Sequence, residues 1–364
     1  MTGASPLRAG ASGRHDVPRV DLVLAPTPLH PAPRLSRELG VEVLFKRDDL
    51  TGAGLGGNKL RGLEFLIADA LVRGCDCLVT GAGQQSNWTM LAALSCLRHG
   101  IEPHIVCYGT APERDEGNLR LHRWLGVDVR FTGVADRSSV DAGIEAIASR
   151  LRAAGRCPYP VPRGGATPLG ALGYLRASRE LAAQVAVLDR PPTGLWLATG
   201  SGGTHAGLVA GAAWARAPYQ VVGVSVSRPA AECRGRVREL AVAAAELGGV
   251  AGVIGEPEVR DGWIGPGYGI PSQAGQDAAR LVAVTEGVLL DPVFAAKAMA
   301  ALIAECREGR LSGPQIFLVS GGAPTLFAGS LTGQVAGDRA TREAVPAGQP
   351  GPWQFAPGGP GVGE

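Results

Sequence analysis

The chain has 364 residues, of which 45% are hydrophobic and 19% are charged, as is typical of a globular protein long enough for two domains. A formal net charge of +2 gives no basic field for nucleic acid, and no apolar run is long enough to span a membrane. The seven cysteines are scattered without a zinc spacing and the N-terminus lacks a signal-peptide core, so we expect a cytoplasmic protein with reduced, buried thiols and no metal site.

The first predicted elements lead toward a glycine-rich loop. Residues 1–17 are rich in Gly, Ala, Ser and Arg without periodicity, which predicts a disordered N-terminus. The elements that follow are an extended segment at Pro26–Leu29, a short helix at Leu35–Leu39 ended by Gly40, and a strand at Val41–Phe45.

The loop at 46–61 places four glycines directly before Lys59, at the start of a helical pattern. Glycine adopts positive φ without steric cost and allows close approach to a ligand. A lysine held at such a crowded, partly dry position loses its proton more easily than a lysine in water, as a Schiff-base lysine must. We expect Asp48 and Asp49 in the same loop to be capping or ion-paired residues rather than catalytic ones.

Two other interpretations of this loop deserve comparison. A phosphate-binding P-loop needs a lysine directly after its last glycine and then a hydroxyl residue. Here Asn58 separates Gly57 from Lys59, and Leu60 stands at the hydroxyl position, so magnesium would lack a ligand. The remaining alternative is a flexible glycine loop that carries a surface lysine.

From Leu60 onward predicted helices and strands alternate, which favours parallel sheets covered by helices on both faces. The segment Arg163–Gly170 breaks this alternation and is a candidate crossing between two domains. The predicted elements before it are helices at 60–73, 87–99 and 119–125 and strands at 77–80, 104–108 and 127–131.

The second half continues the alternation and ends in a Gly/Pro-rich tail. Residues from about Gly333 onward lose periodicity, so we predict a disordered tail, with Trp353 and Phe355 as candidate docking residues. The elements before it are helices at 172–185, after residue 207, at 230–247 and at 294–305, strands at 195–198, 221–226 and 316–319, and a loop at 263–271 that carries Tyr268.

The segment Thr199–Gly207 lies between a predicted strand and a predicted helix. In such a turn the backbone N–H groups and the helix dipole both favour an anion. The glycine spacing does not fit a dinucleotide fingerprint, and no acidic residue ends the following strand. The turn therefore predicts a site for one phosphate.

Pyridoxal phosphate requires an amine, hydrogen-bond donors and a phosphate site. Lys59 after the glycine-rich loop, the Ser86–Asn87 pair and the phosphate turn together match these requirements. The chain resembles the fold type II pyridoxal-phosphate enzymes, and more narrowly the 1-aminocyclopropane-1-carboxylate deaminase and D-cysteine desulfhydrase family. The resemblance extends from about Thr27 to about Phe327. The matching stretches are 27–29, 46–50, 56–59, 85–87, 168–174, 201–207 and 290–293.

This resemblance implies an α/β protein with the two-domain, tryptophan synthase β-like fold, in which helices cover parallel-rich twisted sheets. We expect residues 18–61 plus 171–332 to form a large cofactor-binding domain and residues 62–170 a small domain, with 333–364 as the tail. Pyridoxal 5'-phosphate is the implied cofactor and a small amino acid is the implied substrate. A homodimer is expected because dimers are usual in the family.

The resemblance also implies individual roles. Lys59 would carry the Schiff base and move protons, and Ser86 would hold the substrate carboxylate. Asn87 would contact the ring hydroxyl and Ser320 would face the ring nitrogen. The expected phosphate ligands are Ser201, Gly202, Gly203 and Thr204. The expected catalytic residues are Lys59, Ser86 and Tyr268, and the expected pocket residues are Gln85, Ser86, Trp88, Tyr268 and Phe294.

Three positions depart from the family pattern. Trp88 stands where the family usually has histidine, and Phe294 stands where it usually has tyrosine. Ala295 stands where the deaminase branch has a glutamate for the ring nitrogen, so opening of a cyclopropane ring is not expected. Trp88 and Phe294 admit two interpretations, ordinary core packing or a remodelled pocket.

The favoured function is therefore a pyridoxal-phosphate lyase of amino-acid metabolism, of desulfhydrase or deaminase type, which performs α,β-elimination through Lys59. A hydroxyl partner such as Ser320 would leave the ring nitrogen unprotonated, which suits a good leaving group. One alternative is a biosynthetic enzyme that catalyses β- or γ-replacement on an unusual amino acid. The other is a non-catalytic binding protein on the same fold.

Overall fold

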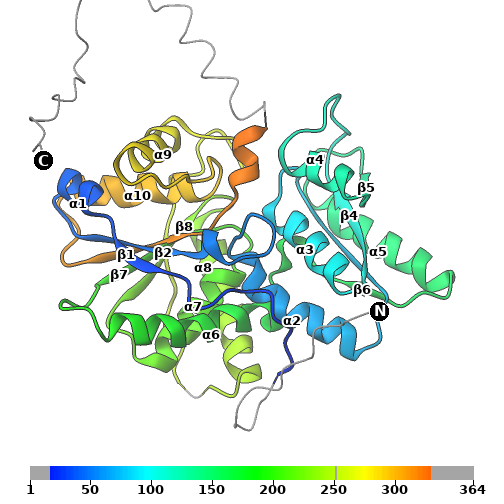
Figure 1. Cartoon of the computed structure of the whole chain (residues 1–364), viewed down its shortest axis with the longest axis horizontal. Coiled ribbons are helices and arrows are strands. Elements are labelled where there is room, and N and C mark those ends of the chain that lie inside the picture. The colour runs from blue at the N-terminus through cyan, green and yellow to red at the C-terminus, as the bar shows by residue number, and fades with distance from the viewer. Residues whose placement is uncertain (1–16, 251, 329–364) are drawn as a thin grey trace, which may run out of the picture.

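Two sheets organise the protein and lie side by side in Figure 1. The computed structural model describes residues 17–250 and 252–328. The larger sheet has the strand order β1-β2-β10-β7-β8-β9 and the smaller sheet the order β5-β4-β3-β6. Every strand pair is parallel except β1 with β2, which confirms the predicted parallel-rich α/β fold.

The strands are short, and those inside the two sheets are buried over almost their whole length. Their bounds are β1 (Leu29–Pro31), β2 (Val43–Arg47), β3 (Cys77–Ala82), β4 (Glu102–Cys107), β5 (Asp128–Phe131), β6 (Pro158–Pro160), β7 (Gly194–Thr199), β8 (Gln220–Ser225), β9 (Glu258–Arg260) and β10 (Gln315–Val319).

The helices connect the strands and cover the sheets. Their bounds are α1 (Pro33–Leu39), α2 (Lys59–Val72), α3 (Asn87–Arg98), α4 (Gly117–Trp124), α5 (Ser139–Ala153), α6 (Pro168–Val185), α7 (Gly203–Ala215), α8 (Ala230–Leu247), α9 (Gln273–Glu286) and α10 (Ala295–Arg307), with 3-10 turns at Asp48–Leu50, Arg163–Gly165 and Ala323–Phe327.

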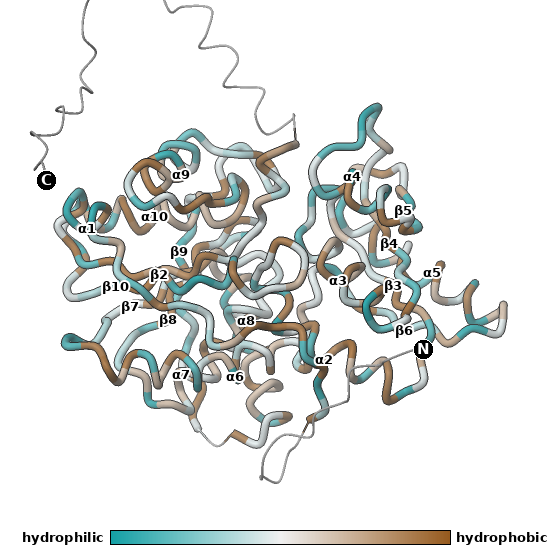
Figure 2. The backbone as a smooth tube through the Cα atoms, in the orientation of Figure 1, coloured by the Kyte–Doolittle hydropathy of each residue, from teal (hydrophilic) through white to brown (hydrophobic). Residues whose placement is uncertain are grey.

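The larger sheet is buried on both faces. Phe45 of β2 and Phe317 of β10 pack in one core cluster with residues of α10, whereas the neighbouring Leu44 and Ile316 pack on the other face with residues of α6. Alternate residues of a strand point to opposite faces, so a strand inside a parallel sheet is mainly apolar. Figure 2 shows this hydrophobic character for β10, which lies inside the sheet.

Helix α6 illustrates how a local signal sets a boundary. The sequence predicted a start near Leu172, but the helix begins at Pro168. Thr167 caps it, because its side-chain oxygen accepts a hydrogen bond from the Gly170 N–H, and proline at the first helical position loses no intrahelical bond.

Several elements were not predicted. Helix α5 buries Val140, Ile144 and Ile147, a spacing that does indicate a helix. Helix α9 likewise begins with a capping serine, Ser272, which accepts a hydrogen bond from the Gly275 N–H. Strands β6 and β9 have only three residues each, and β6 begins and ends with proline, so neither has a readable strand pattern.

The predicted N-terminal disorder over residues 1–16 and the predicted tail, with Trp353 and Phe355, lie outside the described residues. Val17, the last residue of the predicted disordered segment, packs against a core cluster. The predicted domain boundaries near residues 61 and 170 stay a prediction. The smaller sheet does lie wholly within residues 62–170, and the larger sheet wholly outside them.

The cysteines agree with the expected buried thiols except at one position. All seven are free; six are buried, and Cys157 is exposed with its Sγ 3.4 Å from the Sγ of Cys75. Over the ranges 17–250 and 252–328, no helix is both long and apolar enough to cross a membrane.

Candidate active site

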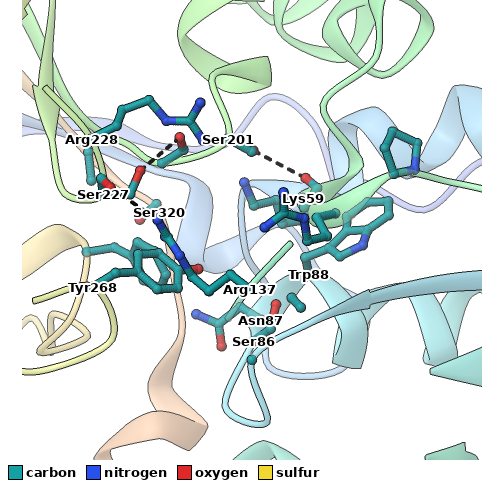
Figure 3. A pocket seen from close by; sticks show the side chains of 18 of the residues that line it. Lys59, Ser86, Asn87, Trp88, Arg137, Ser201, Ser227, Arg228, Tyr268 and Ser320 are labelled. Atoms are coloured by element: carbon teal, nitrogen blue, oxygen red, sulfur yellow. Dashed lines mark hydrogen bonds between the residues drawn. The ribbon is translucent and has the colours of Figure 1, made fainter. Parts of the chain in front are cut away.

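A cavity of about 350 Å³ lies between the two sheets (Figure 3). Residues at the carboxyl ends of β3, β7, β8 and β10 border it, where parallel α/β sheets usually bind ligands. Of the residues named from the sequence, the cavity lining contains Lys59, Ser86, Asn87, Trp88, Ser201, Tyr268, Phe294 and Ser320.

Lys59 is the first residue of α2, and its amine lies in the cavity (Figure 3). Burial lowers the pKa of Lys59 from 10.5 to about 8, because the charged form loses hydration. The chain has only three lysines. Lys46 forms an ion pair with Glu180, and Lys297 donates to two backbone carbonyls, so Lys59 alone carries an uncommitted amine.

The glycine loop before Lys59 is folded tightly. The Thr51 hydroxyl donates to the Gly57 carbonyl at 3.0 Å and accepts from the Gly57 N–H at 2.7 Å. A Cβ on Gly56 would lie 1.9 Å from the Asp49 carbonyl oxygen, and the φ of Gly56 is 70°. Only glycine fits this position. These contacts argue against a flexible loop with a surface lysine.

A buried ionic cluster anchors the same loop to the start of α2. Asp48 accepts two hydrogen bonds from the Arg61 guanidinium, at 2.7 and 2.8 Å, and a third from the Tyr174 hydroxyl. The Arg61 guanidinium holds the pKa of Asp48 below its usual value despite burial. Arg61 also pairs with Glu180. The predicted ion pairing of Asp48 is thus confirmed, and Asp49 pairs with Arg47.

Asn87 is held in a defined orientation at the start of α3. Its Oδ1 accepts a hydrogen bond from Asn118 Nδ2 at 2.8 Å, which leaves the Asn87 Nδ2 free to donate into the cavity. A Cβ on Gly322 would lie 2.3 Å from that Nδ2, so glycine at 322 makes room for the amide. Asn118 was not foreseen, because nothing in the sequence connects it with a residue 31 positions away.

Gln85 does not line the cavity. Its side-chain amide donates to the Glu116 carbonyl at 3.0 Å and accepts from the Asn118 N–H at 2.9 Å. These bonds tie the loop before α3 to the start of α4. The expected role of Gln85 in the substrate pocket is therefore not supported, since both ends of the amide are engaged elsewhere.

The predicted phosphate turn lies at the N-terminus of α7, where Gly202 is the N-cap with a φ of 95°. The Ser201 side chain reaches the cavity, and its carbonyl accepts a hydrogen bond from Arg236 Nε at 2.8 Å. Gly203 and Thr204 form the first turn of α7 behind Ser201, with the Thr204 hydroxyl bonded to Asn58 Nδ2 at 3.0 Å. The first N–H groups of this helix and its dipole favour an anion.

Trp88 serves as a packing residue and as a cavity wall. The side chain is 3% exposed, belongs to a core cluster of the smaller sheet, and donates from Nε1 to the Thr80 hydroxyl at 2.9 Å. The indole lies against Gly165, where an added Cβ would come within 2.3 Å of the ring. These contacts hold the Trp88 ring in place, and the ring forms part of the cavity wall.

Tyr268 and Phe294 form an aromatic wall, with ring centroids 6.0 Å apart at 71°. Burial raises the pKa of Tyr268 to about 12, so its phenol keeps its proton at neutral pH. Asp291 also lines the cavity; burial raises its pKa to about 6, while three backbone N–H groups of the turn before α10 donate to its carboxylate. Over the described ranges, no cluster of His, Cys, Asp and Glu suited to a metal occurs.

The donor set fits pyridoxal phosphate. An uncommitted amine is available on Lys59 for the aldehyde, and free N–H groups at the start of α7 are available for the phosphate. The oriented amide of Asn87 can donate to the ring hydroxyl, and Ser320 at the end of β10 brings a hydroxyl to the same cavity. Lys59, Asn87, Ser201 and Ser320 thus line one cavity, whereas Gly202, Gly203 and Thr204 follow Ser201 in the chain without lining it.

Comparison with known proteins agrees with this geometry. Residues 20–321 match the family model described as pyridoxal-phosphate dependent enzyme. The chain is 40% identical over 322 residues to the D-cysteine desulfhydrase of Salmonella choleraesuis, covering 85% of this chain and 96% of the relative.

Solved structures show the same fold. The crystal structure of an ACC deaminase homologue superposes with a TM-score of 0.81 at 36% identity, covering 88% of this chain and 94% of that chain. An L-serine ammonia-lyase from Rhizomucor miehei superposes with a TM-score of 0.63 at 21% identity, over 88% of this chain and 99% of that one, and shows the fold alone. The chain therefore belongs to the pyridoxal-phosphate dependent enzymes, in the family of 1-aminocyclopropane-1-carboxylate deaminase and D-cysteine desulfhydrase.

Proposed function

We propose that this protein is a pyridoxal-phosphate-dependent lyase that removes a β-substituent from a small amino acid by α,β-elimination. The observation that carries the proposal is the single uncommitted lysine amine, on Lys59, in a cavity that also holds a phosphate turn and an oriented amide. Membership of the family supports the cofactor. The names of its relatives support elimination chemistry.

In this proposal the phosphate is held by Ser201, Gly202, Gly203 and Thr204, the ring hydroxyl by Asn87 and the ring nitrogen by Ser320. Bound pyridoxal phosphate supplies an electron sink for the bond broken at the substrate α-carbon.

The protein residues bind the substrate and move its protons. The Ser86 hydroxyl and the N-terminus of α3 bind the substrate carboxylate, since helix N-terminal N–H groups favour anions. The Lys59 amine takes the α-proton, because an amine with a pKa of about 8 is partly neutral near physiological pH. The Tyr268 phenol, protonated at this pH, donates a hydrogen bond in the pocket.

A substrate panel tests the proposal. Purified protein with added pyridoxal phosphate is given D- and L-amino acids that carry a β-leaving group, and pyruvate and ammonia are measured. We expect both products in equal amounts from at least one substrate, and none from a Lys59→Ala variant. A wild-type protein that binds the cofactor but releases neither product from any substrate would support the binding-protein alternative.

The same assay separates elimination from replacement. With a thiol present, a β-replacement enzyme forms a new thioether amino acid and no pyruvate, whereas a lyase forms pyruvate with or without the thiol. The homodimer expected from the resemblance and the cytoplasmic location expected from the sequence are also proposals. Sedimentation velocity at several protein concentrations tests the first, and fractionation of the source cells tests the second.

A further inference from the structure

Four arginines line the cavity, and three of them have evident structural partners. Arg163 pairs with Asp141 at 2.8 Å and Arg228 with Glu232 at 3.0 Å. Arg236 donates to the Ser201 carbonyl of the phosphate turn. Arg137 differs from these three, because within residues 17–250 and 252–328 it forms no ion pair with a carboxylate and, unlike Arg236, has no short hydrogen bond to a backbone carbonyl.

Arg137 is stacked on an aromatic ring. Its Cζ lies 4.4 Å from the centroid of the Tyr268 ring, and its closest hydrogen bond is a long one, from Nη2 to the Ser227 carbonyl at 3.4 Å. Stacking uses the face of a guanidinium and leaves the N–H groups on its edge available. Those edge groups suit a planar or tetrahedral oxyanion in bidentate geometry.

Arg137 also joins the two sheets across the cavity. It belongs to the connection between β5 and α5 of the smaller sheet, whereas Ser227 follows β8 of the larger sheet. Tyr268, which Arg137 covers, contacts Phe294 edge-on. Figure 3 shows Arg137 and Tyr268 on one side of Lys59 and Trp88 on the other.

The anions already assigned to this cavity have other binding groups. The phosphate turn has the N-terminus of α7 and Arg236, and the substrate carboxylate has Ser86 and the N-terminus of α3. The Arg137 guanidinium therefore borders the part of the cavity left for the substrate side chain, beside Tyr268 and Phe294. A neutral side chain there would leave an unpaired cation facing it.

We propose that Arg137 selects an amino acid whose β-substituent is itself an oxyanion, such as a phosphate or sulfate ester; this inference rests on the proposed function. In the reaction the Cα–H bond and the Cβ–O bond break, and the Cβ–O electron pair leaves with the oxyanion, which Arg137 binds. For a phosphate ester of serine, substrate and one water give pyruvate, ammonia and inorganic phosphate. An oxyanion of this kind is a good leaving group, which suits the weaker electron sink expected if the Ser320 hydroxyl is the partner of the ring nitrogen.

The test compares anionic and neutral substrates, and each variant is compared with wild type on the same substrate, because chloride is a better leaving group than sulfate or phosphate. O-phosphoserine and serine O-sulfate are the anionic substrates and β-chloroalanine is the neutral one, each as both enantiomers. We expect wild-type protein to turn over at least one of the anionic substrates. Arg137→Ala should lower kcat/KM for that substrate about 10- to 100-fold, the range for a charge-assisted hydrogen bond, and change kcat/KM for β-chloroalanine little. Arg137→Lys should restore part of the loss, and Arg150→Ala, which removes an exposed arginine of α5, should change neither.

Three results would overturn the inference. An unchanged kcat/KM of Arg137→Ala for both O-phosphoserine and serine O-sulfate would show that no oxyanion is selected. An equal loss of kcat/KM for all substrates in Arg137→Ala would show that Arg137 binds the α-carboxylate that all substrates share, or that it only holds the two sheets together. A weaker affinity of the Arg137→Ala apoprotein for pyridoxal phosphate would show that Arg137 binds the cofactor.

A binding measurement separates this inference from the proposed function. The thermal midpoint of the holoprotein should rise more with O-phosphoserine than with serine, and Arg137→Ala should abolish the difference. If that difference holds while no substrate is turned over, the proposed lyase function fails and the oxyanion site stands. If substrates are turned over without the difference, the lyase function stands and the oxyanion site fails.

Discussion

Replacement of Lys59 by methionine should stabilise the apoprotein near neutral pH. Burial lowers the pKa of Lys59 from 10.5 to about 8, so the charged amine is less stable in the folded protein than in the unfolded chain. At about 1.4 kcal/mol per pKa unit, this difference amounts to about 3 kcal/mol. The side chain keeps partial contact with water, so we expect a gain of about 1–3 kcal/mol from Lys59→Met.

The pH dependence fixes the sign of this effect. The pKa of Lys59 is lower in the folded protein than in the unfolded chain. The free-energy cost of burying the charged amine is therefore full below about pH 8 and disappears as the pH rises toward 10.5. Urea denaturation of the apoproteins at pH 7 and pH 9.5, followed by tryptophan fluorescence, measures the difference between wild type and variant. That difference should be about halved at the higher pH.

Lys297 provides a contrasting control. It is fully buried, but its Nζ donates to the carbonyls of Ile264 at 2.6 Å and Gly267 at 3.1 Å. Lys297→Met would leave two carbonyls without their donor, so this variant should lose stability. Equal stability of wild-type and Lys59→Met apoproteins at pH 7, or a gain that does not change with pH, would refute the reasoning about Lys59.

Four further substitutions test the packing of the protein and the predicted cofactor site. Gly173→Ala should cost about 1–3 kcal/mol, because an added Cβ would lie 2.3 Å from the Arg61 backbone, whereas Gly235→Ala, with open space in the middle of α8, should stabilise the protein by about 0.5–1 kcal/mol in urea denaturation. Asn118→Ala should weaken pyridoxal phosphate binding about 5- to 10-fold in an absorbance titration, since Asn87 would lose the bond that orients its amide. Gly202→Asp should weaken the same binding by charge repulsion and by strain at a φ of 95°, and unchanged affinity would refute the placement of the phosphate.

Borohydride reduction of the protein with bound cofactor, followed by peptide mapping, should place the pyridoxyl group on Lys59. The other two lysines already donate to Glu180 or to backbone carbonyls. A label on either of them would contradict the assignment.

The parts of the fold that depend on local patterns were predictable. Lys59 follows a glycine loop and begins a helix, and both features can be predicted from the residues next to it in the sequence. The phosphate turn is similarly local, because a strand, a glycine turn and a helix follow one another in the chain. Helix α5 was missed although its apolar spacing is visible, while β6 pairs with β3 only through the tertiary fold.

The parts of the site that depend on distant contacts were not predictable. Asn118 orients Asn87 across 31 positions, and Arg137 meets Tyr268, which is far from it in the chain, only in the folded protein. Gln85 shows the opposite error, since the adjacent Ser86 lines the cavity while the amide of Gln85 binds the start of α4. Adjacency to a site residue says nothing about which way a side chain points in a turn.

The departures at Phe294 and Ala295 bear on cyclopropane chemistry. Phe294 packs on Tyr268 and offers no phenol, and Ala295 is buried at the start of α10, where its N–H donates to Asp291 at 2.9 Å. The Asp291 carboxylate accepts three backbone N–H bonds, so it is not a free replacement acid. General acid–base groups contribute about 10²–10⁴-fold in rate.

We therefore expect negligible deamination of 1-aminocyclopropane-1-carboxylate, whereas β-elimination through Lys59 needs neither missing group. The combined variant Trp88→His, Phe294→Tyr tests whether the two aromatics set the substrate preference. Trp88 is both a core residue and a cavity wall, so its replacement should reduce stability and also widen the cavity. A variant that folds, gains no activity on D-cysteine and keeps the wild-type preference would identify both aromatics as packing residues. Efficient opening of the cyclopropane by the wild-type protein would contradict the argument from Phe294 and Ala295.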